Sequence, residues 1–517
     1  MCCVLNRVKR QRNYSDVGQS SGLPVRGASS SVTLRALNSR PVARPAGWSA
    51  ASRLHRRASH LLIALVVCCL PRAFAQSSIQ TILANGPVSN RLNIVVLSEG
   101  YTTNQLAQFP GDAANAAAAL LAHQPYQEYS NYFNVFAIAV ASSQSGSDHP
   151  AYGYYVNTYF NSTYDPVSDR LITIPPNFAD TNYSHGQGKV DALLQTYMPD
   201  CQLPILLVND FTDGGSDGFN KTAVASIGYE SPEILTHETG HVLANLGDEY
   251  TNANPGFPVS SAEEPNTTQQ TNLLLIKWNV WIPTNTPIPT PPTSDYSSVI
   301  GLFQGAHYNP TNWYRPKFDC LMNHLYVPFC DVCSEALVLA FYQKVRPVDA
   351  FAPASTNLSV STTQALTFSL TLLQPATHNL DVQWFTNGVP SDGATNPTFT
   401  VLPQSLVSGS NWVSAMTKDN TPLVRDDPTN LLAQTVTWAV NVNRSQPRLD
   451  SPLWLTGAKF AFRIVGDAPQ GVVVQYSTNL FNWVPVATNS LAGGQLWYTN
   501  TPPATSPRGF YRALTPE

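Results

Sequence analysis

Basic residues are scarce in most of this chain. The first 75 residues hold 12 of the 29 lysines and arginines but only one of the 33 acidic residues. The remaining 442 residues carry 17 basic and 32 acidic residues, a net charge of −15. Because such a chain repels phosphate groups, we expect neither nucleic acid nor an anionic membrane as a partner. The length of this part predicts two to four domains.

Long apolar runs are also lacking. The run from Leu61 to Leu70 is shorter than the ~20 residues that a membrane-spanning helix needs. Three arginines precede it, and Ala73 and Ala75 place small residues at the two positions that a signal peptidase reads. We therefore predict a leader and secretory signal peptide over residues 1–75. The mature chain is expected to be secreted, periplasmic or at the cell surface, without a membrane span.

Cysteine is rare after the leader: residues 76–517 contain only Cys201, Cys320, Cys330 and Cys333. In an exported protein, this even number predicts up to two disulfides, and four cysteines allow three pairings. A structural zinc site made from all four thiolates is the alternative. The sequence leaves the choice between these two interpretations open.

A metal-binding pattern stands at the centre of the chain. His237, Glu238 and His241 form the motif HExxH. On a helix, residues four apart share one face, so both imidazoles can reach one ion while Glu238 faces its open side. Two imidazoles and one further ligand leave a position for water, whose proton Glu238 can accept. A lone HExxH also occurs on ordinary helices, so the third ligand matters.

The third ligand is predicted to be Asp248. In metzincin peptidases, a group of zinc peptidases, the metal-binding helix ends at a glycine three residues before the third ligand. Here Ala244 occupies the glycine position, and the next residue, Asn245, tolerates the left-handed conformation that stops a helix. An unbroken helix would carry Asp248 about 16 Å along the axis from His237, so we predict a turn after Asn245. Glu249 is the alternative carboxylate.

The stretch HETGHVLANLGDEY resembles the metal motif of the M64 (IgA peptidase-like) family of secreted zinc metallopeptidases. The resemblance covers roughly residues 80 to 345. Further blocks are similar to blocks of that family and stand in the same order: residues 90–101, 132–135, 145–148, 303–308, 314–316, 320–322 and 329–333. The resemblance implies a metzincin-like catalytic domain with one catalytic zinc ion and a protein or peptide substrate.

Further site residues are expected around this motif. Met322 stands where metzincins carry the Met-turn, whose thioether packs beneath the ligands; it is one of only four methionines, although a plain core methionine is the alternative. His307 and His324 are not expected to be ligands. Four residues could donate hydrogen bonds to the developing oxyanion, and no spacing selects one of them: Tyr250, Tyr308, Tyr314 and Arg315.

Alternating apolar strands and helices predict an α/β fold ahead of the metal helix. Residues 223–229 are expected to form an edge strand that either pairs with an extended substrate or is an ordinary sheet edge. Residues 266–296, rich in polar residues and proline, are expected to be a surface excursion. The expected strands are 91–97, 133–140 and 203–208, and the expected helices are 103–122, with a break at Pro110, and 186–198.

Short β-prone runs with turn residues follow Val345. They predict an Ig-like β-sandwich over residues 346–450, with Trp384 in its core, and a small β module over 451–517. Residues 76–345 form the predicted catalytic domain. We expect a monomeric, secreted zinc endopeptidase, and the competing interpretation is a catalytically inactive, zinc-stabilised binding protein. The intact Glu238 argues against the latter, because a structural site needs no base.

Overall fold

The computed structural model describes residues 78–217, 221–252, 262–361, 364–503 and 508–516. The predicted leader and its cleavage site near Ala75 lie outside these residues. Among the described helices, none has the length and apolar character that crossing a membrane would require.

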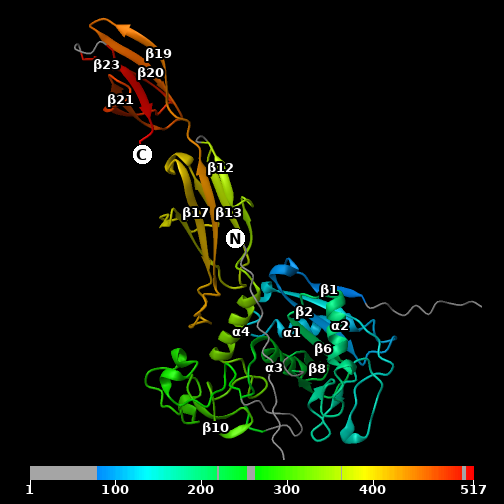
Figure 1. Ribbon diagram of the computed structural model, residues 1–517. Coiled ribbons are helices and arrows are strands. Elements are labelled where there is room, and N and C mark those ends of the chain that lie inside the picture. The colour runs from blue at the N-terminus through cyan, green and yellow to red at the C-terminus, as the bar shows by residue number, and fades with distance from the viewer. Residues whose placement is uncertain (1–77, 218–220, 253–261, 362–363, 504–507, 517) are drawn as a thin grey trace, which may run out of the picture. The chain divides into compact units, whose positions relative to one another are not determined.

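A six-stranded sheet with the order β1-β3-β2-β6-β8-β7 forms the centre of the N-terminal half. Strands β1, β2, β6 and β8 of this sheet are labelled in Figure 1. The four inner strands run parallel, whereas β1 and β7 run antiparallel to their neighbours. The mixed α/β organisation predicted for this half is confirmed. The strands are β1 (Ile79–Leu83), β2 (Leu92–Glu99), β3 (Phe133–Ile138), β6 (Leu203–Val208), β7 (Gly215–Ser216) and β8 (Ala223–Ser226).

Helices cover both faces of this sheet, which is why β2 is buried along its whole length. Ile94 and Val96 point into the core shared with α1, α3 and α4, whereas Val95 and Leu97 point into the core on the α2 side. The helices are α1 (Phe109–Leu120), α2 (Gln187–Tyr197), α3 (Ser231–Ala244) and α4 (Asp331–Lys344).

The helix predicted from residue 103 begins later than expected. Pro110 lies in the first turn of α1 rather than at a break inside it. Proline is favoured there because its missing N–H would have no partner in the first turn anyway. Residues before Phe109 form turns instead.

Residues 266–296 contain short 3-10 helices, and the prediction of a surface excursion is wrong for part of them. Trp278 and Trp281 are buried and belong to the same core as α3 and α4. Two short strand pairs complete this half. One pairs β4 (Thr163–Tyr164) with β5 (Ile172–Thr173), ahead of α2, and the other pairs β9 (Phe303–Ala306) with β10 (Asn309–Arg315), ahead of α4.

After Val345 the described chain is almost entirely β. A three-stranded and a five-stranded sheet share one hydrophobic core, in which Trp384 is fully buried and stacks on Trp438. The three-stranded sheet contains β11 (Val348–Ala352), β13 (Leu366–Leu372) and β16 (Thr398–Val401). The other contains β12 (Asn357–Val360), β18 (Ala433–Val442), β17 (Gly409–Lys418), β14 (Asp381–Thr386) and β15 (Val389–Pro390).

Two three-stranded sheets with their own core end the chain. The predicted boundary between residues 450 and 451 falls inside β19, which pairs with β20, so the last β unit starts by Arg448. The strands are β19 (Arg448–Leu455), β20 (Lys459–Val465) and β23 (Gln495–Asn500), and β22 (Val484–Ser490), β21 (Gly471–Ser477) and β24 (Phe510–Leu514).

Candidate metal centre and active site

Helix α3 presents both histidines of the motif to one point. The Nε2 atoms of His237 and His241 lie 3.1 Å apart, and both side chains are buried. The helix stops at Asn245, whose backbone is left-handed with φ 51° and ψ 40°. The N–H of Leu246 then donates to the carbonyl of Gly240, which closes the last turn.

The turn after α3 brings Asp248 back over the histidines. Its Oδ1 lies 3.0 Å from Nε2 of His237 and 3.4 Å from Nε2 of His241. Asn266, which is fully buried, fixes this turn: its Oδ1 accepts from the N–H of Gly247 and its amide donates to the Gly247 carbonyl. The predicted return of the chain is therefore present in the structure.

This donor set fits a divalent cation. Nδ1 of His237 faces the Leu321 carbonyl at 3.0 Å, and Nδ1 of His241 faces the Leu246 carbonyl at 2.6 Å. A carbonyl only accepts, so each Nδ1 carries the proton and each Nε2 turns a lone pair inward. Two lone pairs and the Asp248 carboxylate thus converge. Donors that share a tetrahedral zinc ion stand about 3.3 Å apart, close to the observed spacing.

Glu238 belongs to the same buried group, and its carboxylate oxygen lies within 4.8 Å of the histidine nitrogens. Burial raises the pKa of Glu238 to about 7, although the histidines oppose the rise. Burial lowers the pKa of His241, but the Asp248 charge outweighs it and raises this pKa to about 10 when no cation is bound. A bound cation would replace the proton on Nε2. Despite burial, His241 and His237 hold the pKa of Asp248 well below its ordinary value.

A cleft with a volume of about 350 Å³ opens beside His237 and Glu238. The segment that carries Arg170 and Leu171 forms one wall, together with Gly215. A Cβ on Gly215 would stand 3.2 Å from a Glu238 carboxylate oxygen and 2.3 Å from the Ile234 side chain. Glycine at this position therefore leaves room for Glu238.

The expected edge strand, residues 223–229, is not an edge. Strand β8 pairs with β6 on one side and with β7 on the other. The outer strand β7 is itself covered, because the N–H of Gly215 donates to the Arg170 carbonyl at 3.3 Å. The prediction failed because residues 215–216 are too short a run to be recognised as a strand.

Met322 is buried beneath α3. A Cβ on Gly240, between the two histidines, would approach the Met322 sulfur to 3.2 Å and the Leu246 side chain to 3.1 Å. The glycine of the HETGH motif thus allows the thioether to lie directly under the helix. The N–H of Glu249 donates to the Met322 carbonyl at 2.7 Å, so this segment also supports the turn that carries Asp248.

The family model for the IgA peptidase M64 family matches residues 80–296 and 292–341. The chain belongs to the M64 peptidase family. Membership supports peptidase activity and therefore a protein or peptide substrate, and it agrees with the resemblance seen in the sequence. The matched residues include all of α3, the turn to Asp248 and the Met322 segment.

Comparisons with other proteins add little to this membership. No curated protein matches the chain. Among solved structures it is similar to the apo structure of Bacteroides uniformis beta-glucuronidase 3, at 9% identity and a TM-score of 0.13, over 42% of this chain and 30% of that chain. It is also similar to the chicken CNTN1 FN1-FN3 domains, at 12% identity and a TM-score of 0.14, over 32% of this chain and 58% of that chain. The chain spans less than two thirds of either structure, and both TM-scores are too low to indicate a shared fold.

The four proposed oxyanion donors of this M64 peptidase lie in different places. Tyr250 lines the cleft, and Tyr308 donates its hydroxyl to Asp248. Tyr314 is buried in the core, and Arg315 donates to the carbonyls of Gln304, Gly305 and Phe318. Tyr314 and Arg315 are not among the residues that line the cleft. The core holds the Tyr314 ring, and three carbonyls hold the Arg315 guanidinium.

The histidines excluded as ligands have other partners. Nδ1 of His307 lies 2.9 Å from Glu264, and Nδ1 of His324 lies 2.6 Å from Asp319. His324 is exposed at the cleft. Neither histidine belongs to the two groups of described residues that could hold a metal ion, and their exclusion as ligands stays a prediction.

None of the four cysteines forms a disulfide in the described structure. Cys201 packs on the α2 face of the sheet, whereas Cys320, Cys330 and Cys333 gather with Glu249 on the other face. The sheet therefore separates Cys201 from the other three. This separation excludes a zinc site made from all four cysteines. The predicted disulfides are not formed among these four cysteines in the structure.

Several residues of the site were not predicted. Asn266 fixes the turn from 18 residues beyond Asp248, and no local pattern marks it. Arg170 comes from a loop and Gly215 from the two-residue strand β7, and only the fold brings them to the cleft. The carbonyls of Leu246 and Leu321 carry no side-chain signal at all.

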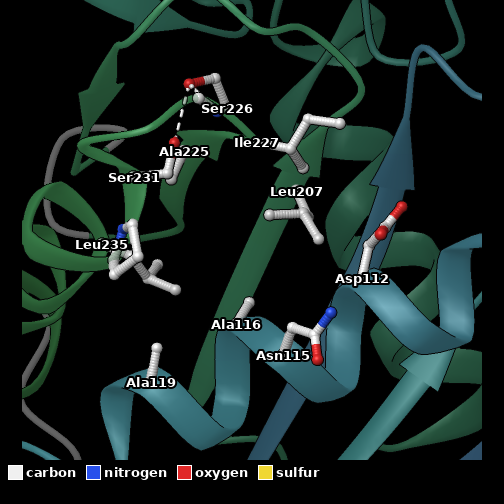
Figure 2. Close-up of a pocket in the computed structure, with 12 residues that line it drawn as sticks. Asp112, Asn115, Ala116, Ala119, Leu207, Ala225, Ser226, Ile227, Ser231 and Leu235 are labelled. Atoms are coloured by element: carbon white, nitrogen blue, oxygen red, sulfur yellow. Dashed lines mark hydrogen bonds between the residues drawn. The ribbon is translucent and has the colours of Figure 1, made fainter.

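A second cavity of about 200 Å³ lies between α1, β6, β8 and the start of α3. Figure 2 shows its lining, which is mostly apolar. The hydroxyls of Ser226 and Ser231 form a hydrogen bond with each other. Asp112, the charged residue in this lining, accepts a hydrogen bond from the Tyr101 hydroxyl at 2.9 Å. Neither of the two groups of described residues that could hold a metal ion contributes to this lining, so the cavity is separate from His237, Glu238 and His241.

Proposed function

We propose that this M64 peptidase is a zinc-dependent endopeptidase in which Glu238 is the general base. The observation that carries the proposal is the convergence of Nε2 of His237, Nε2 of His241 and Oδ1 of Asp248 on one point, with Glu238 beside them in an open cleft. A bound zinc ion would polarise the peptide carbonyl and acidify a water molecule.

Residues of the chain move and hold the protons. A Glu238 carboxylate oxygen accepts a proton from the attacking water and then passes it to the amine nitrogen of the leaving peptide fragment. The carbonyls of Leu321 and Leu246 keep Nδ1 of each histidine protonated, which leaves each Nε2 as a donor to the ion. Tyr308 holds the second carboxylate oxygen of Asp248. Tyr250, on the cleft wall, is placed to donate to the developing oxyanion.

We propose a secreted protein whose leader is removed near Ala75, because the apolar run and the small residues at the cleavage site have the form of a signal peptide. The two-sheet unit after Val345 supports an Ig-like accessory domain, and the metal helix with Met322 beneath it supports a metzincin-like catalytic domain. The mature chain is proposed to be a monomer.

The test is cleavage of casein by the purified full chain. We expect about one equivalent of zinc to be required for this activity, a chelator to abolish it, and added zinc to restore it. Activity that survives complete removal of metal would contradict the proposal. A chain that binds zinc and never cleaves casein or a peptide library would support the inactive binding protein instead.

A further inference from the structure

Three cysteines and one glutamate meet beneath the active site. Cys320 lies two residues before Met322, Cys330 occupies the position just before α4, and Cys333 lies in the first turn of that helix. Glu249, the residue after the proposed ligand Asp248, points into the same cluster. At most 5% of any of these four residues is exposed to solvent.

The spacing of these groups is that of ligands around one ion. The sulfurs of Cys320 and Cys333 are 3.7 Å apart, and the Cys333 sulfur lies 3.5 Å from Oε1 of Glu249. Two sulfurs bound to one zinc at about 2.3 Å stand about 3.8 Å apart, and a sulfur and an oxygen stand about 3.6 Å apart. A disulfide requires about 2.05 Å.

The hydrogen bonds of Glu249 are incomplete without a further partner. Its Oε1 accepts from the Asn266 amide at 2.9 Å, whereas its buried Oε2 has no hydrogen-bond partner among the described residues. An unpaired buried carboxylate oxygen is costly. A disulfide bond would not supply the partner, because its sulfurs carry no hydrogen to donate to Oε2.

Helix α4 points its N-terminal end at two of the cysteines. Cys330 and Cys333 lie at the N-terminus of α4, where the helix dipole stabilises negative charge. The N–H of Cys330 donates to the Cys320 sulfur at 3.2 Å. The spacing C-x-x-C at a helix start, completed by a third cysteine from a preceding turn, is typical of structural zinc sites.

We propose that Cys320, Cys330, Cys333 and Glu249 bind a second, structural zinc ion. Four protein ligands close its coordination shell, so this ion has no place for water or substrate. The proposal does not depend on peptidase activity.

The second site supports the first through the backbone. The N–H of Glu249 donates to the Met322 carbonyl, and the carbonyl of Leu321, next to Cys320, holds Nδ1 of His237. An ion that fixes Glu249 therefore also fixes the neighbouring Asp248. By fixing Cys320, it fixes the Leu321 carbonyl that orients His237. Its loss is expected to weaken binding of the catalytic metal by roughly 10- to 100-fold, as for other residues that orient metal ligands.

Cobalt(II) is the probe, because cobalt bound by thiolates shows an intense near-ultraviolet charge-transfer band. The catalytic ligands contain no thiolate, so this band reports only the second site. We expect the full chain to bind two equivalents of cobalt or zinc and to show the band. Cys330→Ser and Glu249→Gln should each lose one equivalent and weaken or abolish the band. His241→Ala should lose the other equivalent and keep the band.

Cys201→Ser is the matched control, because this cysteine lies on the other face of the sheet, and we expect it to keep both metals and the band. If the cysteine variants do not fold, the metal content and cobalt spectrum of the unmodified chain still decide the question. One equivalent of metal without the band would overturn the proposal. So would an intact mass that is lower by two hydrogens and shows a disulfide among the three cysteines.

Discussion

At the scale of single residues, Asp248 and Glu249 are neighbours with different destinations. The Asp248 carboxylate faces the two histidines, whereas the Glu249 side chain points into the cysteine cluster. A step of one residue in an extended turn reverses the direction of the side chain. The structure thus places Asp248, and not Glu249, beside the histidines, and the role of Asp248 as the catalytic ligand stays a prediction.

The protonation of Glu238 gives a prediction for protein stripped of metal. Burial raises the pKa of Glu238 from 4.5 to about 7, so the folded chain binds a proton more tightly than the unfolded chain. Its contribution to stability is therefore present below about pH 4.5 and is lost as the pH rises through about 7. The variant Glu238→Gln has no such loss.

The unfolding free energy of wild type should fall as the pH rises from 5 to 8, and that of Glu238→Gln should not fall in this way. We expect the variant to become more stable relative to wild type over this range by up to about 3 kcal/mol. Denaturant unfolding of chelator-treated protein at the two pH values measures this change. With zinc bound the difference should shrink, because a cation favours the ionised carboxylate. A difference between variant and wild type that is independent of pH would contradict the prediction.

At the scale of elements, the end of α3 determines where Asp248 lies. The left-handed conformation of Asn245 is strained for most side chains and free of strain for glycine. We expect Asn245→Gly to keep zinc affinity. We expect Asn245→Val to lose roughly 1–3 kcal/mol of stability and to bind zinc more weakly, because a β-branched residue resists positive φ and displaces the turn.

Unfolding midpoints and competition with a chelator for zinc measure both effects. The two substitutions at one position separate backbone conformation from the loss of the asparagine side chain. Equal zinc affinity of Asn245→Val and wild type would show that the helix stop does not position Asp248.

The part of the site that could be predicted from sequence is local. His237, His241 and the stop at Asn245 lie within nine residues, so helix geometry alone relates them. Asn266, Gly215 and Arg170 reach the site through strand order and long loops, which one sequence does not reveal. Trp278 is buried although its neighbours are polar, because the core that receives it is made by α3 and α4.

At the scale of the whole molecule, the first β unit contributes to the core of the peptidase half. The hydroxyls of Tyr129 and Tyr342 both donate to Asp419, at 2.8 and 2.7 Å. Leu373 and Leu432, which follow Val345 in the chain, belong to the same core as α4. The predicted domain boundary at residue 345 therefore cuts through packed residues.

We expect a chain that ends at Val345 to fold and cleave small peptides but to be less stable than one that ends at residue 447, by at least about 3 kcal/mol. The apolar area and the hydrogen bonds lost at the cut account for this amount. Denaturant unfolding and peptide cleavage of both truncated chains measure it. Equal unfolding free energies would show that the two parts are energetically independent.

The central claim is that Glu238 is the base of a metal-dependent peptidase, and it is tested most directly by Glu238→Gln. Turnover of casein and zinc content are measured on the same samples of variant and wild type. We predict unchanged zinc, because Glu238 is not a ligand, and a rate lower by about 10²- to 10⁴-fold. Zinc retained together with turnover equal to that of wild type would contradict the claim.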